Sequence, residues 1–431
     1  MRAVRLFYNL FFPFVLVALL PNFLLRMLRR GKYRHKFGQR FAIYSARVRQ
    51  KLAPGGWTWV HAVSVGEVLI ALKLIREMKQ QDPSLRIVLS TTTSTGYVLA
   101  NRQRCEWLEP IYHPIDFYWI AKRAIRLIQP KLMILVEAEI WPNLTAEAKA
   151  HGAKLALVNA RLSARSEKRY RMIRWLAAPI FNQLDLLCVQ DPLDRERWKS
   201  LGVKPEKILL TGSIKFDEAV SSRVPRDFRP VLRDSGVAEG APILLAASTH
   251  AGEEVILGRI FLALREKFPN LFYVVVPRHA ERGRDVRDQL ERLGLNTALR
   301  IGDAYPVSHP EALVVNTTGE LRDWYACATA VFVGKSLTAK GGQNPAEAVV
   351  AGKPVVVGPN MQNFGTLVAQ LVREKGIRQV DDETTLQAVL ESFLNDPEQS
   401  ALLAANGARC VEEHRGATAR TGQALAQITK S

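Results

Sequence analysis

From Trp57 onward, short apolar runs rich in β-branched residues alternate with stretches of helical periodicity. This alternation is typical of βαβ units, whose parallel strands are covered by helices on both faces. The pattern runs through the first half of the chain and restarts in the second. We therefore expect an α/β fold with two doubly wound sheets. The expected strands are 57–60, 87–90, 132–136, 155–158 and 186–189, then 243–248, 272–277, 312–316, 330–334 and 354–358. In the first half, the expected helices are 68–78, 118–128, 141–149 and 192–200.

The first fifty residues carry much of the formal charge of +19, because they contain basic residues and no acidic one. Residues 6–25 form an uncharged apolar run, about the ~20 residues that a helix needs to cross a bilayer. Pro13 and Pro21 interrupt this run, so a helix that lies in the membrane interface is the alternative. No small-residue cleavage site follows the run, which argues against a removed signal peptide.

Seven basic residues follow the apolar run between Arg26 and Arg40. Positive charge is retained on the cytoplasmic side, so we expect the bulk of the chain on the cytoplasmic face of the inner membrane. The same cations would attract anionic lipid or an anionic substrate, or would only set the topology. Nucleic acid is not an expected partner, because no recognition module accompanies the positive charge.

A polar, proline-containing segment separates the two halves, and a chain of 431 residues is too long for one ordinary core. The last helix of the chain can belong to the second domain in sequence and still pack against the first domain. The expected parts are 1–45 as membrane anchor and basic flank, 46–219 as a first Rossmann-like domain, 220–242 as the linker and 243–431 as a second Rossmann-like domain.

Three glutamates follow expected strands of the first half, where parallel sheets bind ligands. Glu67 is the first acidic residue of the chain and begins a helix, whose N-terminus favours a negative charge. It is a candidate general base, or else an ordinary acid in a first helical turn. Glu137 and Glu139 can orient a polar substrate or bind arginines, or form a solvated salt bridge. We propose no metal site and no cofactor, since the carboxylates and histidines lack enough partners.

The segment from Gly341 to Glu347 has the composition of a phosphate site at a helix N-terminus. Gly341 and Gly342 allow close approach of the backbone, while Asn344 suits the cap before a first helical proline. Glu347 is placed to accept hydrogen bonds from ribose hydroxyls. A plain capped helix is the alternative.

Basic and hydroxyl residues collect after other strands of the second half, where they can neutralise an anionic sugar nucleotide. The residues are Ser213, Lys215, Ser248, Thr249, His250, Pro277 and Arg278. The four cysteines are scattered without a CxxC pair, which indicates neither a disulfide framework nor a thiolate metal site.

Ten motifs in a fixed order resemble those of the 3-deoxy-D-manno-octulosonate (Kdo) transferases of lipid A biosynthesis. The motifs are HAVSVGE, VEAEIWPN, NARLS, VQD, GSIKFD, AASTH, VVPRH, GELRDWY, AVFVGKS and GGQNPAEA. One departure is Lys335, where the resemblance leads us to expect a second glycine, and it leaves open how closely that loop approaches the donor.

The resemblance implies a GT-B glycosyltransferase fold, association with the cytoplasmic membrane surface, and no metal. It also implies transfer of Kdo, with inversion, from CMP-Kdo to a lipid A precursor. The first domain would bind this acceptor and the second the CMP-sugar. Glu67 corresponds to the catalytic base, while Lys215, Ser248, Arg278, Asn344 and Glu347 lie within donor-binding motifs. Two alternatives stay open: a GT-B transferase or epimerase using another sugar nucleotide, and a non-catalytic membrane scaffold.

Overall fold

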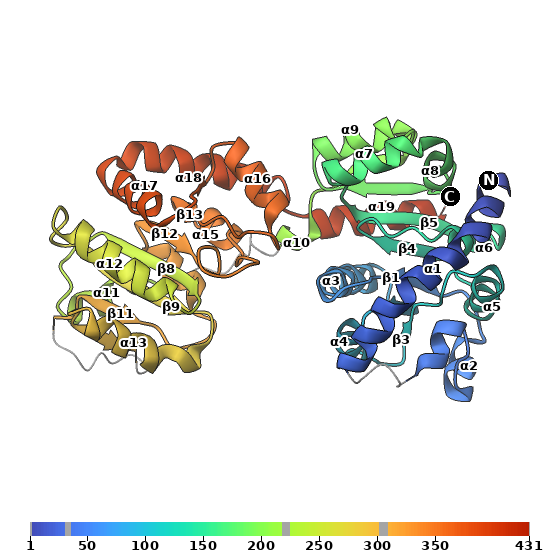
Figure 1. Cartoon of the computed structure of the whole chain (residues 1–431), viewed down its shortest axis with the longest axis horizontal. Coiled ribbons are helices and arrows are strands. Elements are labelled where there is room, and N and C mark those ends of the chain that lie inside the picture. The colour runs from blue at the N-terminus through green and yellow to red at the C-terminus, as the bar shows by residue number, and fades with distance from the viewer. Residues whose placement is uncertain (1, 31–35, 218–224, 301–308, 431) are drawn as a thin grey trace. The chain divides into compact units, whose positions relative to one another are not determined.

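The computed structural model describes residues 2–30, 36–217, 225–300 and 309–430. The chain divides into two units, one of Met1–Asp217 with Gly416–Ser431 and one of Glu218–Arg415. Each unit is built on a seven-stranded sheet whose paired strands are all parallel, with helices packed around it (Figure 1). The predicted α/β class with two doubly wound sheets is therefore confirmed.

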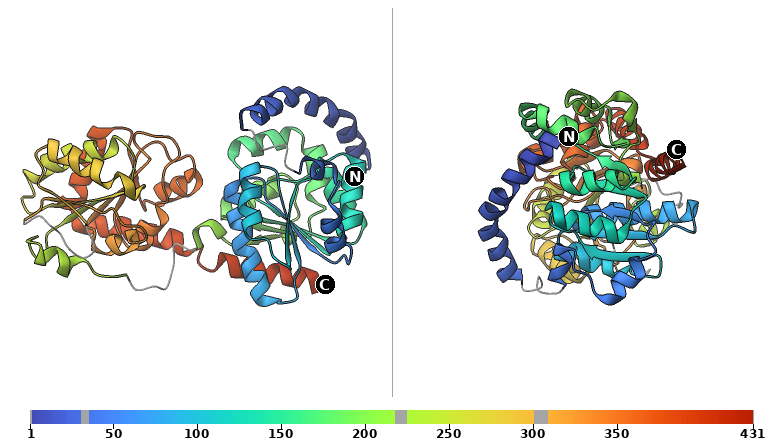
Figure 2. Two further views of the ribbon diagram at one scale, coloured as in Figure 1. Left: turned by 90° about the horizontal axis from the view of Figure 1, so that it is seen from below. Right: turned by 90° about the vertical axis from the view of Figure 1, so that its right-hand side faces the viewer.

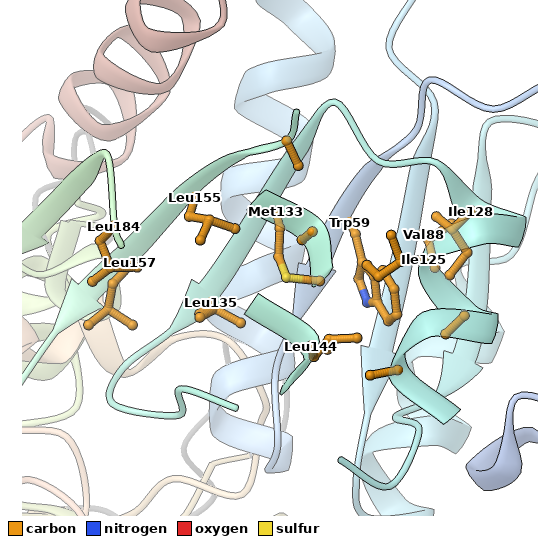
Figure 3. Close-up of a cluster of buried hydrophobic side chains, with 14 of the residues drawn as sticks. Trp59, Val88, Ile125, Ile128, Met133, Leu135, Leu144, Leu155, Leu157 and Leu184 are labelled. Atoms are coloured by element: carbon orange, nitrogen blue, oxygen red, sulfur yellow. The ribbon is translucent and has the colours of Figure 1, made fainter. Parts of the chain in front are cut away.

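The sheet of unit 1 has the strand order β3-β2-β1-β4-β5-β6-β7. Side chains alternate between its two faces, as the period of two requires. Trp59, Met133 and Leu135 enter one apolar cluster (Figure 3), while Val60 and Ile134 enter the cluster on the opposite face. The strands are β1 (Thr58–His61), β2 (Ile87–Thr91), β3 (Leu108–Tyr112), β4 (Leu132–Val136), β5 (Lys154–Ala160), β6 (Leu186–Val189) and β7 (Ile208–Leu210).

The helices of unit 1 cover both faces of this sheet, and the last helix of the chain, α19, packs against α3. Arg420 of α19 donates to the carbonyl of Thr211. The α-helices are α1 (Arg2–Arg30), α2 (Ala46–Leu52), α3 (Val65–Gln81), α4 (Ser94–Arg102), α5 (Tyr118–Ile128), α6 (Pro142–Ala150), α7 (Ala164–Met172), α8 (Arg174–Phe181), α9 (Pro192–Ser200), α10 (Ile214–Asp217) and α19 (Ala417–Lys430). Two 3-10 helices are η1 (Phe37–Phe41) and η2 (Pro205–Lys207).

The sheet of unit 2 has the order β10-β11-β9-β8-β12-β13-β14. Its strands are β8 (Ile243–Thr249), β9 (Phe272–Pro277), β10 (Thr297–Leu299), β11 (Ala312–Val314), β12 (Ala330–Val333), β13 (Val355–Val357) and β14 (Arg378–Gln379). Its helices are α11 (Arg229–Asp234), α12 (Glu253–Arg265), η3 (Ala280–Arg282), α13 (Gly283–Arg292), α14 (Leu321–Cys327), α15 (Ala346–Val350), α16 (Gly365–Arg373), α17 (Glu383–Asn395) and α18 (Pro397–Glu412).

Four strands, β3, β7, β10 and β14, lie outside the predicted set. Strands β7, β10 and β14 have only two or three residues each, and β3 contains a glutamate and a proline. In β3, Glu109 is buried against Lys51 and Arg104, which neutralise its charge. Pro110 is tolerated because β3 is an edge strand. Part of the predicted linker, up to residue 224, lies outside the described residues, and α11 follows within unit 2.

Helix α1 runs as a curved helix along the outside of unit 1 (Figure 2). Its N-terminal part is tied to α6, because Arg5 pairs with Glu147 at 2.5 Å and Asn9 hydrogen-bonds to Asn143. Among the described residues, no helix is both long enough and apolar enough to cross a bilayer.

Two of the basic residues that follow the apolar run contact other parts of unit 1. Arg40 is buried, donates to the carbonyl of Thr92 at 2.7 Å and lies over the Tyr112 ring. Lys36 donates to the hydroxyl of Tyr97 at 2.6 Å. These contacts fix the chain between α1 and the sheet. Two further basic residues of this segment, Lys32 and Arg34, lie outside the described residues.

Candidate active site

Each sheet has one switch point, where successive strands are added on opposite sides, and such points form the ligand crevices of open parallel sheets. In unit 1 the switch lies between β1 and β4, and in unit 2 it lies between β8 and β12. Glu67 follows β1, and Glu137 follows β4 directly. His250 follows β8, and Lys335 lies just after β12. The residues singled out from the sequence therefore gather at the two places where ligand binding is expected.

Glu67 lies in the first turn of α3 and closes a capping box with Ser64. One carboxylate oxygen, Oε1, accepts from the backbone N–H of Ser64 at 3.2 Å and from its hydroxyl at 2.8 Å. The other, Oε2, accepts from the N–H of Val63 at 2.9 Å. A carboxylate has about four lone-pair positions, so Oε2 keeps one for a further donor. The Glu67 side chain thus caps the helix and still has an acceptor position for a ligand, and it is 9% exposed.

Glu137 and Glu139 share the electrostatic environment of Glu67. Burial raises the pKa of Glu137, and the charge of Glu67 raises it further, while Arg161 and Lys215 oppose the rise. Burial also raises the pKa of Glu139, followed by the effects of Glu67 and Glu137. The positive φ of 66° at Glu137 is uncommon for a side chain of this kind and is typical of functional loops. The three carboxylates form one acidic cluster at the switch point of unit 1.

Lys215 and Ser213 follow β7, so they lie at the carboxyl edge of the first sheet, in unit 1, and not among the strand ends of the second half as expected. Burial lowers the pKa of Lys215, with a smaller lowering from Arg161 and an opposing effect of Glu137. The Ser213 hydroxyl lies 3.5 Å from the side-chain oxygen of Asn159. Lys215 therefore supplies positive charge to the acidic cluster.

Two residues of this edge, Asn159 and Arg161, were missed as site residues from the chemistry of the sequence. Asn159 has a positive φ of 51°, and its side-chain oxygen accepts from the N–H of Ile214 at 3.0 Å, which places Lys215. The positive charge of Arg161 lowers the pKa of Glu137 and that of Lys215. Only their position in the NARLS motif, at the end of β5, could have indicated them.

Two stacked histidines lie at the carboxyl ends of β1 and β3. The rings of His61 and His113 are 3.7 Å apart between centroids, and that of His113 is 5.4 Å from Trp141. Burial lowers the pKa of His61 to about 4 and that of His113 well below its ordinary value. Both rings are therefore neutral at physiological pH and serve as packing for the edge.

The switch point of unit 2 lies between the ends of β8 and β12, and the end of β9 is next to β8. Ser248 has a positive φ of 53°, and the buried Thr249 accepts from the N–H of Arg278 at 3.0 Å, which joins the ends of β8 and β9. Pro277 ends β9, and Arg278 is exposed beyond it. The ring of His250 lies 3.2 Å from the side-chain amide of Gln343. The predicted residues of AASTH and VVPRH are thus brought together.

The glycine loop also belongs to this edge. Gly341 and Gly342 have positive φ values of 118° and 72°, and the N–H of Gly342 donates to the carbonyl of Lys335 at 3.0 Å. Helix α15 begins one residue later than expected, at Ala346, and its N–H donates to the side chain of Asn344 at 3.1 Å. Helix α15 has only five residues, and the N–H groups of Gly341, Gly342 and Gln343 already donate within the protein, to Gln362, Lys335 and Gly334.

Glu347, in the first turn of α15, lies 3.5 Å from the guanidinium of Arg322. This pairing leaves the carboxylate partly exposed and oriented. Lys335, the departure from the expected glycine, adopts a glycine-like positive φ of 54°. In the part of the chain that the structure describes, no group of three or more histidine, cysteine or carboxylate side chains is arranged to hold a metal ion.

Two parallel sheets with polar residues at both switch points define the GT-B class, which includes glycosyltransferases and sugar-nucleotide epimerases. A solved UDP-GlcNAc 2-epimerase from Neisseria meningitidis, bound to UDP-GlcNAc, matches 86% of this chain and 99% of its own with a TM-score of 0.53 at 12% identity. This likeness shows the fold alone, and the predicted GT-B fold is confirmed.

Sequence comparison then gives the family. A family model described as 3-deoxy-D-manno-octulosonic-acid transferase (kdotransferase) matches residues 35–218. The 3-deoxy-D-manno-octulosonic acid transferase of Haemophilus influenzae is 33% identical over 396 residues, covering 90% of each chain. The solved C-terminal CMP-Kdo binding domain of WaaA from Acinetobacter baumannii is 29% identical and covers 42% of this chain and 95% of its own, with a TM-score of 0.40. This chain belongs to the Kdo transferase family and is a glycosyltransferase, as the motif order predicted.

Proposed function

We propose that this chain moves Kdo from CMP-Kdo to a sugar hydroxyl of a lipid A precursor and releases CMP, with Glu67 as general base. Family membership supports Kdo as the transferred sugar, since a relative that matches 90% of this chain is named 3-deoxy-D-manno-octulosonic acid transferase. CMP as the carrier and the lipid A precursor as the acceptor rest on the resemblance of the motifs. The observation that carries the residue assignment is the Glu67 carboxylate at a switch point, oriented by three hydrogen bonds and with a lone pair left on Oε2.

The proposed acceptor edge is the acidic cluster of unit 1 with its two cations. Oε2 of Glu67 would take the proton of the attacking hydroxyl as the new glycosidic bond forms. Glu137 and Glu139 have raised pKa values, so they can share hydrogen bonds with acceptor hydroxyls without adding full repulsion to Glu67. Lys215 and Arg161 would stabilise the ionised base and the anionic sugar that approaches it.

The proposed donor edge is the carboxyl end of the second sheet. The exposed Arg278 would bind the phosphate of CMP and stabilise its charge as the bond to the anomeric carbon breaks. The glycine loop, which has no side chains at 341 and 342, would let the donor approach the backbone closely. The carboxylate of Glu347 would accept hydrogen bonds from the ribose hydroxyls. Attack from the face opposite CMP inverts the anomeric carbon and needs no covalent enzyme intermediate.

A panel of nucleotides tests the donor class. CMP is expected to raise the melting temperature of the full chain, whereas UDP and GDP at the same concentration are not, because ligand that binds only the folded state stabilises it by mass action. A larger shift with UDP or GDP than with CMP would favour a transferase or epimerase for another sugar nucleotide.

We also propose that α1 lies in the interface of the cytoplasmic membrane. An exposed apolar stripe on α1 runs through Leu6, Leu10, Phe14 and Val17. The ring of Phe7 contacts that of the exposed Trp175 on α8, at 5.9 Å, so the two helices share this face. Exposed cations lie beside Trp175 on α7 and α8: Arg165, Lys168, Arg169, Arg171 and Arg174. Apolar side chains next to cations are the composition that binds anionic lipid surfaces.

Replacing both Leu10 and Phe14 by glutamate should lower partition onto anionic vesicles by a factor of about 100 or more, since each apolar side chain contributes roughly 1.5–3 kcal/mol when it leaves water. Co-sedimentation measures this loss. Leu402→Glu is the matched control, because Leu402 in unit 2 is 59% exposed and Leu10 is 62% exposed. Equal sedimentation of the double variant and the control would refute the assignment.

A further inference from the structure

Glu253 is a buried carboxylate at the first position of α12. In the described residues, no lysine, arginine or histidine side chain pairs with it within 4.0 Å. Burying a carboxylate without compensation is costly, so its negative charge must be balanced by dipoles. The nearby N–H groups provide this balance, together with the N-terminus of the 13-residue α12.

Four backbone N–H groups from two loops donate to this one carboxylate. Oε2 accepts from His250 at 2.9 Å and from Lys335 at 2.7 Å. Oε1 accepts from Ser336 and from Leu337, both at 3.0 Å. The loop after β8 and the loop after β12 are thereby held to a common point at the switch of unit 2.

The glycine loop is held through the second of these loops. The carbonyls of Gly334 and Lys335 accept from the N–H groups of Gln343 and Gly342, at 3.1 and 3.0 Å. Three segments with predicted donor-binding residues therefore depend on the position of the loop that Glu253 binds. Its hydrogen bond to Lys335 also helps to hold that residue at its positive φ, where the resemblance predicts glycine.

The fit around the carboxylate leaves no room for adjustment. A Cβ atom at Gly334 would lie 2.5 Å from the carbonyl oxygen of Ser248 and 2.8 Å from Oε2 of Glu253. The absence of a side chain at 334 is therefore required for the β12 loop to approach both β8 and the carboxylate. The Glu253 carboxylate therefore joins the ends of β8 and β12 in close contact.

We infer that Glu253 is a positioning residue of the donor site, which arranges the backbone around the phosphate of CMP-Kdo without touching the donor. This inference rests on the proposed function for the identity of the donor. In Glu253→Gln, one of the two acceptor oxygens becomes an NH2 group that faces two N–H donors. One of the two loops must then separate from the carboxamide, and the segments that carry the predicted donor-binding residues lose their arrangement.

The test is calorimetric titration of the full-length chain with CMP, together with kinetics and a thermal melt of each variant. Glu253→Gln is expected to weaken CMP binding by about tenfold or more, the effect of losing hydrogen bonds to a charged group. KM for CMP-Kdo should rise in parallel, while KM for the lipid and kcat at saturating donor change less than about threefold. Glu253→Asp keeps the charge but is shorter, so it should fall between wild type and Glu253→Gln.

Leu257→Ala is the matched control, because Leu257 is buried one turn further along α12 and contacts the core cluster of unit 2. It should lower the melting temperature and leave CMP affinity within about twofold. Equal CMP affinity in wild type and Glu253→Gln would overturn the inference, as would an equal loss in Leu257→Ala. If Glu253→Gln does not fold, wild-type affinity in Glu253→Asp would overturn it. Failure of the wild-type chain to bind CMP would instead refute the proposed donor, and the inference with it.

Discussion

Glu67→Gln is expected to reduce Kdo transfer to below a few per cent of the wild-type rate, with CMP binding unchanged. General-base catalysis contributes about 10²–10⁴-fold, and glutamine cannot take a proton from the acceptor hydroxyl. Glutamine can still accept both hydrogen bonds from Ser64 through its oxygen, so α3 keeps most of its cap. The rate is measured as CMP released on mixing CMP-Kdo, lipid acceptor and enzyme.

The control must separate the base from the capping box that Glu67 also completes. Ser64→Ala removes the capping hydroxyl and is expected to cost about 0.5–2 kcal/mol of stability. Transfer should remain within about threefold of wild type in this variant, because Glu67 still accepts from the N–H groups of Val63 and Ser64. If both Glu67→Gln and Glu67→Ala kept more than a few per cent of the activity, the base assignment would be wrong.

Glu347→Gln is expected to affect the donor and not the chemical step. Hydrogen bonds to a charged group contribute about 1.5–3 kcal/mol, so KM for CMP-Kdo should rise by about 10- to 100-fold while kcat stays within about threefold. Initial rates at varied CMP-Kdo concentrations measure both constants. A fall in kcat with an unchanged KM would contradict the ribose assignment.

Glu311→Gln provides the comparison for this variant. Glu311 pairs with Arg265 and precedes β11, so it lies at the amino edge of the second sheet, away from the switch point. Its loss removes an ion pair of unit 2, as Glu347→Gln does at Arg322. KM for CMP-Kdo should stay within about twofold of wild type, which separates loss of an ion pair from loss of a ligand contact.

The repeating pattern of apolar runs was enough to predict the fold, because buried parallel strands are nearly continuous in Val, Ile and Leu. Strand β4 and helix α5 have the predicted bounds. The pattern could not reveal β3, where Glu109 is buried because Lys51, from α2, and the nearby Arg104 neutralise its charge. Short edge strands such as β7 carry too few residues to stand out.

The candidate site was predictable where an unusual residue directly follows a strand, as Glu67 and Glu137 do. The sequence could not tell whether Glu67 caps a helix or faces a ligand, since the answer depends on which lone pairs its neighbours use. Lys215 was predicted at the edge of the second sheet and lies at the edge of the first, because β7 was not recognised as a strand. Glu253 resembles any acid in a first helical turn, and only the folded chain brings the N–H groups of a loop over eighty residues away to its carboxylate.

The most direct test of the account is mass spectrometry of the lipid after incubation of the full chain with CMP-Kdo and the tetraacylated lipid A precursor. The account predicts that the lipid gains one or more whole Kdo residues, that CMP is released in equal amount, and that neither product forms with Glu67→Gln. A wild-type chain that binds CMP but leaves the lipid mass unchanged would contradict it and would favour a non-catalytic membrane scaffold.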